Sequence, residues 1–370
     1  MNFYNIYLQY KDFDFHNYFA NITDNQVLNA IQKDVLSHND LLALLSPCAE
    51  KHLEQIAQSA QKISFQNFGK AIVLYTPIYI SDYCDNQCAY CSFNVTNNIT
   101  RKKLSFEEIE REAKSIASTG LRHILVLTGD SRKHSPVSYI CESVKILKKY
   151  FPAISLEIYA LEEAEYTELI EAGADGLTIY QETYNEELYK KLHPAGPKRN
   201  YNYRLDAPER ACKAWIRSVN VGALFGLSDW RKDVFFTLLH AQYLQDKYSD
   251  TEISVSFPRM RPHTGKFEVS FPVSDQHLVQ MIIASRIFLK RAGITISTRE
   301  NSKFRDNLIG LGVTRMSIGS ITAVGGHTTG NQYGQFKIAD NRDVETFKQV
   351  LLNKGFEPVF KDWQNILLNE

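Results

Sequence analysis

The sequence has no long hydrophobic run, no excess of either charge and no dense set of cysteines. Its longest apolar stretch, residues 71–80, is about half the length of a membrane-spanning helix. The N-terminus has no basic segment followed by an apolar one, so no secretory signal is expected. The 42 lysines and arginines balance 42 aspartates and glutamates, which leaves no net field to attract nucleic acid or an anionic membrane. The sequence therefore predicts a cytoplasmic globular protein that binds neither nucleic acid nor membrane.

The six cysteines are too few, in a chain of 370 residues, for a disulfide-rich secreted domain. Three of them stand alone, whereas Cys84, Cys88 and Cys91 fall close together. Thiolate ligands favour zinc or iron–sulfur sites. A structural zinc ion takes four ligands, so it would need a distant partner such as His123 or His263. Three thiolates on one loop can instead hold three irons of a [4Fe–4S] cluster and leave the fourth iron open.

The apolar pattern divides the chain into an N-terminal helical extension, residues 1–69, and a longer region, 70–370, in which strands alternate with helices. Eight strands are predicted, over 71–80, 123–128, 153–160, 174–180, 219–225, 252–257, 295–300 and 314–320. This alternation indicates parallel strands joined by right-handed crossovers. Eight such units favour a closed α/β fold, the (β/α)8 barrel, with a doubly wound open sheet as the alternative.

Polar residues cluster at the carboxyl ends of the predicted strands, which is where barrels of this type carry their active sites. A barrel without a reaction to perform would not need them there. The residues concerned are Tyr79, Thr128, Gly129, Asp130, Glu157, Gln181, Glu182, Arg299 and Ser317.

The cysteine triplet and its surroundings carry a family resemblance. The segment CDNQCAYC, with an aromatic residue before its last cysteine, resembles the signature of radical S-adenosylmethionine (SAM) enzymes. Further segments, in order YTPIYISDYCDNQCAYCSF, VLTGD, YQETY, GALFGLSDW, SVSFPRMRPHTG, STRE and KDW, look like the tyrosine lyases of thiamine biosynthesis, the 2-iminoacetate synthase family. The resemblance extends from about residue 70 to 363.

This resemblance implies a radical SAM (β/α)8 barrel with a [4Fe–4S] cluster on Cys84, Cys88 and Cys91 and with SAM on the open iron. It implies cleavage of SAM to methionine and a 5′-deoxyadenosyl radical, and of the Cα–Cβ bond of L-tyrosine to 2-iminoacetate and 4-cresol, for the thiazole of thiamine. The expected partners are a thiazole synthase and a flavodoxin- or ferredoxin-type reductant. The alternatives are another aromatic amino-acid lyase, such as a tryptophan lyase, and a metal-binding barrel without turnover.

The resemblance also implies roles for single residues. Tyr90 corresponds to the aromatic that flanks the adenine of SAM, and Glu157 is a candidate for the ribose hydroxyls, with a buried ion pair as its alternative. The other candidate contacts to SAM or substrate are Thr128, Gly129, Asp130, Gln181 and Glu182.

On the substrate side, Arg299 is the candidate for the tyrosine carboxylate, because a guanidinium group binds a carboxylate in bidentate fashion. Its alternative is a salt bridge with Glu300 or Glu182. Ser317 is expected to assist Arg299. Tyr79 is expected near the reacting amino group, unless it is a core tyrosine.

Some segments depart from the family pattern or have no assigned role in it. His327 replaces an aromatic residue in the segment 321–336, which puts the contacts of that segment in question. Arg259 and Arg261 are candidate clasps of the loop after the sixth strand, and the basic triplet 101–103 is a candidate docking surface for the reductant. No cysteine follows Cys212, whereas the related hydrogenase-maturation lyase has a C-terminal extension with further cysteines, so 2-iminoacetate is expected to leave intact.

Overall fold

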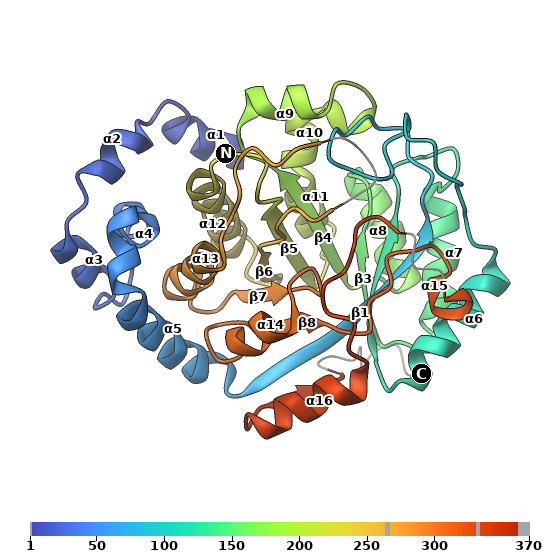
Figure 1. Cartoon of the computed structure of the whole chain (residues 1–370). Helices are drawn as coiled ribbons and strands as arrows, with labels where there is room; N and C mark the ends of the chain where they lie inside the picture. The colour runs from blue at the N-terminus through green and yellow to red at the C-terminus, as the bar shows by residue number, and fades with distance from the viewer. Residues whose placement is uncertain (1, 263–266, 331–333, 362–370) are drawn as a thin grey trace.

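The computed structural model describes residues 2–262, 267–330 and 334–361. Eight parallel strands form a closed barrel, in which β1 pairs with both β2 and β8 (Figure 1). This closure confirms the predicted (β/α)8 barrel and excludes the open sheet. The strands are β1 (Ala71–Ser81), β2 (His123–Thr128), β3 (Ala153–Glu157), β4 (Gly176–Glu182), β5 (Ser218–Ala223), β6 (Glu252–Ser256), β7 (Gly293–Ile296) and β8 (Arg315–Ser317).

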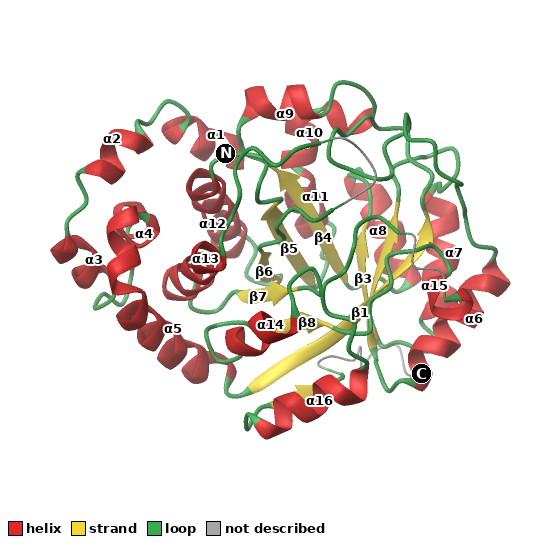
Figure 2. Ribbon diagram, in the orientation of Figure 1, coloured by secondary structure: helices red, strands yellow, loops and turns green. Residues whose placement is uncertain are grey.

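Helices between the strands surround the barrel, as Figure 2 shows. Capping residues determine where these helices begin. Ser105, for example, is the N-cap residue of α6 and forms a capping box with Glu108. The helices after β1 to β8 are α6 (Phe106–Ser118), α7 (Val137–Leu147), α8 (Glu163–Ala172), α9 (Glu186–Leu192), α10 (Tyr201–Leu205), α11 (Ala207–Lys213), α12 (Trp230–Lys247), α13 (Asp275–Phe288), α14 (Ser302–Leu308), α15 (Gly326–Thr329) and α16 (Val344–Asn353). In the described part of the chain, no helix is long and apolar enough to cross a lipid bilayer.

The chain between β4 and β5 is helical but interrupted, as the segment HPAGPKR in the sequence indicates. It forms α9, a short 3₁₀ turn at Pro197–Arg199, α10 and α11, because Gly196 turns the chain with φ of 96°. One element differs from the sequence-based expectation. A short strand, β9 (Glu357–Val359), was missed; it pairs with the first residues of β1, outside the eight-stranded barrel.

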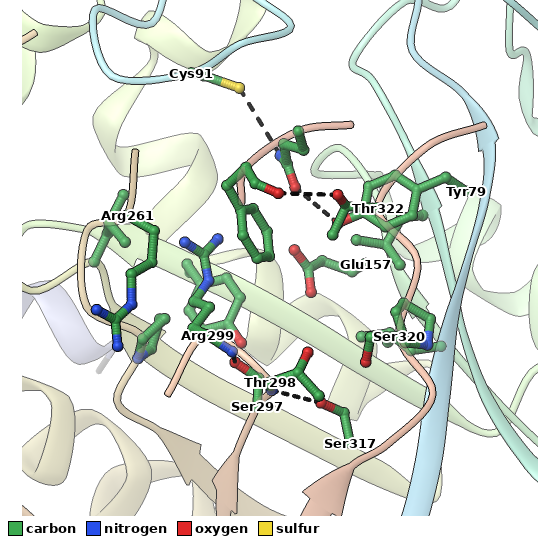
Figure 3. Close-up of a pocket in the computed structure, with 18 of the residues that line it drawn as sticks. Tyr79, Cys91, Glu157, Arg261, Ser297, Thr298, Arg299, Ser317, Ser320 and Thr322 are labelled. Atoms are coloured by element: carbon green, nitrogen blue, oxygen red, sulfur yellow. Dashed lines mark hydrogen bonds between the residues drawn. The ribbon is translucent and has the colours of Figure 1, made fainter. Parts of the chain in front are cut away.

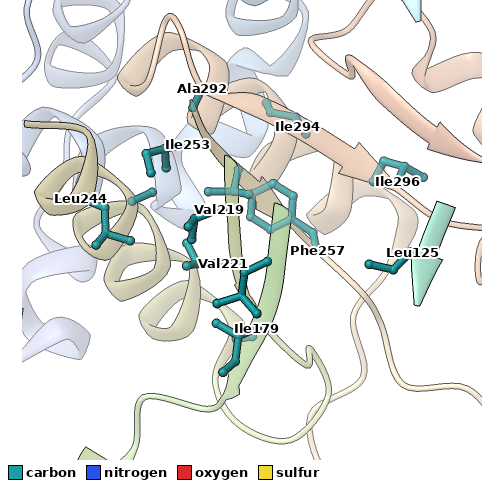
Figure 4. Close-up of a cluster of buried hydrophobic side chains, with 14 of the residues drawn as sticks. Leu125, Ile179, Val219, Val221, Leu244, Ile253, Phe257, Ala292, Ile294 and Ile296 are labelled. Atoms are coloured by element: carbon teal, nitrogen blue, oxygen red, sulfur yellow. The ribbon is translucent and has the colours of Figure 1, made fainter. Parts of the chain in front are cut away.

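The main core lies between the outer face of the barrel strands and the surrounding helices. Figure 4 shows part of it, including Leu244 of α12 and Val219 and Val221 of β5, the strand against which α12 packs. Burial of each such aliphatic side chain contributes about 1.5–3 kcal/mol. The inner face at the amino ends of the strands is polar instead, with a small cavity lined by residues that include Ser155, Thr178, Ser218, Asn220, Ser254 and Thr295.

The N-terminal helices pack on one side of the barrel, against α12 and α13 (Figure 1). They are α1 (Phe3–Tyr10), α2 (Phe15–Ala20), α3 (Asp24–Ala30), α4 (His38–Leu45) and α5 (Leu53–Phe68), with a 3₁₀ turn at Pro47–His52. The side chain of Gln280 in α13 donates hydrogen bonds to the carbonyls of Leu44 and Ser46, at 2.9 Å each. The domain boundary after residue 69 stays a prediction.

Candidate active site

A pocket opens at the carboxyl ends of the strands, and we call it the barrel pocket (Figure 3). Its empty volume is about 970 Å³, a figure that includes the open mouth. Seven of the residues predicted from the sequence line it: Tyr79, Tyr90, Cys91, Glu157, Glu182, Arg299 and Ser317. Their roles stay predictions, but the structure brings them to one cavity.

The three clustered cysteines follow β1 on a loop, residues 82–94, which we call the cysteine loop. All three are free thiols. Burial, with a smaller contribution from the neighbouring Cys91, raises the pKa of Cys84 to about 11 and that of Cys88 to about 12. Neighbouring buried thiols of this kind ionise readily only when a strong cation binds them. The donor set therefore fits an iron–sulfur cluster, which would be held by Cys84, Cys88 and Cys91 and leave one iron open to SAM.

The structure speaks against one form of the zinc alternative. Among the described residues, no three or more Cys, His, Asp or Glu side chains already surround a common metal position; this holds for the three cysteines as well, so it does not separate zinc from a cluster. His123 lies at the amino end of β2, where its Nε2 is 3.0 Å from the Ser155 hydroxyl, so it is at the wrong end of the barrel to join the cysteines. The other candidate, His263, lies outside the described residues.

The cysteine loop is fixed to two neighbouring segments through the buried side chain of Asn86. Its Nδ2 donates to Asp130 at 2.7 Å, and its Oδ1 accepts from the Lys198 backbone amide at 2.9 Å. Gly196 lies against the same side chain, because a Cβ there would be 2.4 Å from Asn86 Oδ1. The loop is therefore held between the end of β2 and the segment before α10.

The segment Thr128-Gly129-Asp130 supports the cysteine loop and does not line the barrel pocket. Gly129 approaches so closely that a Cβ would lie 2.2 Å from the Tyr83 carbonyl oxygen. The carboxylate of Asp130 is directed to Asn86, and the Thr128 hydroxyl is buried with no hydrogen-bond partner in the described part of the chain. Contacts of this segment with SAM stay a prediction.

Alternation along β4 separates two other candidates. Tyr180 and Glu182 line the barrel pocket, whereas Gln181 between them is buried outside it. Glu182 has φ of 70° and forms an ion pair with Lys198, which also lines the pocket. Lys198 and the more distant Arg204 hold the pKa of Glu182 below its usual value despite burial.

Tyr90 is held beside the cysteines by a buried histidine. Its hydroxyl lies 2.8 Å from Nε2 of His193, and Nδ1 of His193 lies 2.8 Å from the Tyr189 carbonyl oxygen. A carbonyl can only accept, so Nδ1 carries the proton, and Nε2 accepts from the Tyr90 hydroxyl. Burial lowers the pKa of His193 to about 3, which keeps the ring neutral.

Glu157 and Arg299 provide opposite charges in the barrel pocket, as Figure 3 shows. Burial raises the pKa of Glu157 to about 7, and the attraction of Arg299 opposes this rise. Among the described residues neither side chain forms a salt bridge, so the ion pair considered for Glu157 is not formed. The Arg299 guanidinium stacks on the Phe336 ring, 3.4 Å from its centre.

The alternative partners of Arg299 are both taken by other cations. The Glu300 carboxylate binds Arg259, with Nε to Oε1 at 3.0 Å, and accepts from Nη2 of Arg261 at 2.7 Å. Arg259 also donates to the Val273 carbonyl at 2.9 Å, which agrees with its expected role as a clasp of the loop after β6. The guanidinium group of Arg299 therefore remains available to a ligand carboxylate.

The remaining substrate candidates have partners within the pocket. The Ser317 hydroxyl accepts from the Thr298 amide at 3.0 Å. The Tyr79 hydroxyl donates to Oε1 of Gln335 at 2.9 Å, and Nε2 of Gln335 lies 3.9 Å from Sγ of Cys91 (Figure 3).

Sequence reasoning missed several lining residues that lie outside the strands and α-helices, among them Lys198 of the 3₁₀ turn and the loop residues Gln335 and Phe336. Loop residues carry no periodic signal. His327, which raised the question about the segment 321–336, does not line the pocket; its Nε2 lies 3.0 Å from the Pro77 carbonyl, and its amide donates to Glu112 of α6.

Comparison with known proteins agrees with this site. Two family models match the chain: the radical SAM superfamily over residues 78–238 and the biotin and thiamin synthesis associated domain over 256–357. The 2-iminoacetate synthases of Escherichia coli (strain K12) and Salmonella typhimurium (strain LT2) are each 38% identical over 347 residues, which is 93% of this chain and 92% of those proteins. The crystal structure of HydG, a maturase of the [FeFe]-hydrogenase, superimposes with a TM-score of 0.89 at 30% identity, over 94% of this chain and 80% of that chain.

The barrel, the cysteine loop and these matches define a radical SAM protein, a class whose members use a [4Fe–4S] cluster and SAM. The match to the 2-iminoacetate synthases covers nearly the whole chain, so it identifies a family within this class. The chain belongs to the 2-iminoacetate synthase family, which confirms the resemblance identified in the sequence.

Proposed function

We propose that this protein is a lyase that cleaves the Cα–Cβ bond of L-tyrosine to give 2-iminoacetate and 4-cresol for thiamine biosynthesis. The observation that carries this proposal is the barrel pocket, where Cys91 lines the same cavity as the guanidinium of Arg299, which pairs with no described carboxylate. A cofactor ligand and a receptor for an amino-acid carboxylate are thereby enclosed together. The similarity to 2-iminoacetate synthases over nearly the whole chain supports it.

The bound cluster and SAM would supply a 5′-deoxyadenosyl radical, which can remove a hydrogen atom from the tyrosine amino group. The chain itself binds, orients and protects the reactants. Arg299 binds the carboxylate, and Ser317 helps to define that end of the site. Tyr79 lies toward the amino group, with its hydroxyl fixed by Gln335.

The SAM contacts are proposed on the other side of the pocket. Tyr90 lies beside the adenine, and Glu157 accepts from the ribose hydroxyls. Glu182 is a further contact. Thr128, Gly129, Asp130 and Gln181 do not line the described pocket, so their contacts with SAM rest on the family resemblance alone.

The proposed partners follow from the reaction. 2-Iminoacetate is unstable in water, so it would pass to a thiazole synthase. The electron would come from a flavodoxin- or ferredoxin-type reductant, which is consistent with a location in the cytoplasm.

The product assay tests this function. Anaerobically reconstituted protein is incubated with SAM, dithionite and either L-tyrosine or L-tryptophan. We expect 4-cresol and 5′-deoxyadenosine from tyrosine, and neither product from Cys91→Ala. Formation of 3-methylindole from tryptophan would point to a tryptophan lyase, and absence of 5′-deoxyadenosine would point to a barrel without turnover.

A further inference from the structure

Arg101 connects the two ends of the cysteine loop. One of its guanidinium nitrogens, Nη1, donates to the carbonyls of Asp82 at 2.7 Å and Phe93 at 2.8 Å, and Nη2 donates to the carbonyl of Asn94 at 2.7 Å. Asp82 precedes the three cysteines in the sequence, and the other two residues follow them. A single planar cation therefore closes the loop into a ring, through three hydrogen bonds from the two terminal nitrogens of the arginine fork.

The adjacent backbone reinforces this closure. The Lys102 amide donates to the Asp82 carboxylate at 2.7 Å, and the Asp82 amide donates to the Lys102 carbonyl at 3.1 Å. Ser81, the last residue of β1, forms a bridge with Lys103. The segment that carries Arg101 is thus fixed to the start of the loop.

The side chains of this basic triplet are engaged within the protein. Lys102 forms an ion pair with Glu108 at 3.1 Å, and the Lys103 ammonium lies 3.9 Å from the centre of the Tyr139 ring. The Arg101 guanidinium donates its hydrogen bonds to carbonyls of the cysteine loop. These contacts favour an internal role over the docking surface that the sequence suggested.

We propose that Arg101 is a positioning residue of the cluster site, which holds the cysteine loop closed so that its three thiolates keep the spacing a [4Fe–4S] cluster requires. This inference rests on the proposed function only in assuming that the loop binds a cluster. A cluster held by three cysteines depends more on the conformation of the cysteine loop than a cluster held by four cysteines, because no fourth cysteine restrains it. Arg101 lies outside the barrel pocket, so it acts through the loop and not on the reactants.

The test compares Arg101→Lys and Arg101→Gln with Lys102→Gln, a control that removes a neighbouring positive charge but keeps the loop contacts. Iron and sulfide are counted in each reconstituted protein, and the rate at which a ferrous chelator removes iron is measured. The EPR spectrum of the dithionite-reduced cluster is recorded with and without SAM. Because dithionite replaces any protein reductant, docking does not affect these readouts.

We expect both Arg101 variants to lose iron at least about tenfold faster than wild type, because glutamine carries no charge and lysine has its donors on one nitrogen, which cannot occupy the positions of both Nη1 and Nη2. Their EPR signals should broaden, and the Lys102→Gln protein should match wild type. If Arg101→Lys keeps the wild-type rate and spectrum, the proposal is wrong. It is also wrong if the variants melt at lower temperature but give unchanged chelation and EPR, since Arg101 would then only support the fold.

If Arg101→Gln does not fold, the decision rests on Arg101→Lys and on hydrogen exchange of the loop amides, which should be faster than in Lys102→Gln. These readouts do not involve tyrosine. A wild-type protein that holds a cluster but makes no 4-cresol would overturn the proposed function and leave this inference standing.

Discussion

Replacement of Arg299 by alanine should weaken tyrosine binding while sparing the cofactor. The guanidinium lies over the Phe336 ring, and no described carboxylate pairs with it, so it is preorganised for a ligand carboxylate. A hydrogen bond to a charged group contributes about 1.5–3 kcal/mol, which corresponds to a rise in the tyrosine KM of about 10- to 150-fold. Arg299→Lys keeps the charge but loses the fork, so its KM should lie between the two.

The assay is the dependence of 4-cresol formation on tyrosine concentration, with 5′-deoxyadenosine measured in the same samples. Cleavage of SAM without tyrosine should persist in Arg299→Ala, since the substrate alone loses its anchor. Arg111→Ala, an exposed arginine of α6, is the matched control and should behave as wild type. An unchanged tyrosine KM in Arg299→Ala would refute the assignment.

Three further changes test the supporting structure. Gly129→Ala would place a Cβ 2.2 Å from the Tyr83 carbonyl oxygen; it should displace the cysteine loop, destabilise the protein by about 1–3 kcal/mol and lower the iron bound per chain, and a full iron content would contradict this. Because burial raises the pKa of Glu157 from 4.5 to about 7, the folded protein holds a proton that the unfolded chain loses, so the free energy of unfolding falls between these pH values and is flat above them. Between about pH 5 and about pH 8, the free energy of unfolding of SAM-free Glu157→Gln should fall by about 3 kcal/mol less than that of the SAM-free wild type. Urea unfolding at the two pH values measures this difference, and an identical pH dependence in the two proteins would argue against the raised pKa of Glu157. Asp340→Ala leaves the fully buried Arg305 without its ion-pair partner and should cost about 3–5 kcal/mol in the same unfolding assay, whereas a loss below about 1 kcal/mol would show that the pair is dispensable.

The barrel was predictable because each strand is a short apolar run followed by an amphipathic helix. β9 was not, because it has only three residues, one of them Pro358, and it adds to the edge of β1 near its start. The helical region 185–217 is interrupted at Gly196 and Pro197, two residues that break helices, in a segment whose sequence is otherwise typical of helices.

The site was predictable where a residue belongs to a strand end. Glu157 and Ser317 end β3 and β8, and Arg299 follows β7, so the parallel barrel brings them together. The same alternation places Gln181 outside the pocket, a distinction that the sequence argument did not draw.

Other parts of the site depend on contacts that no local pattern encodes. Gln335 meets Tyr79 across 256 positions of the sequence. The ionic partner of Glu300 could be decided only after Arg259 and Arg261 were located beside it. In the sequence, Arg101 looks like part of a basic triplet on the surface. Only the structure shows that its side chain donates to three backbone carbonyls.

The most direct test of the central claim is the ratio of 4-cresol to 5′-deoxyadenosine formed by anaerobically reconstituted wild-type protein supplied with SAM, dithionite and L-tyrosine. The account predicts that the two products form together, near one to one at saturating tyrosine, with 2-iminoacetate or its hydrolysis product glyoxylate alongside them. Formation of 5′-deoxyadenosine without 4-cresol would show that the barrel pocket cleaves SAM but does not act on tyrosine, and would contradict the account.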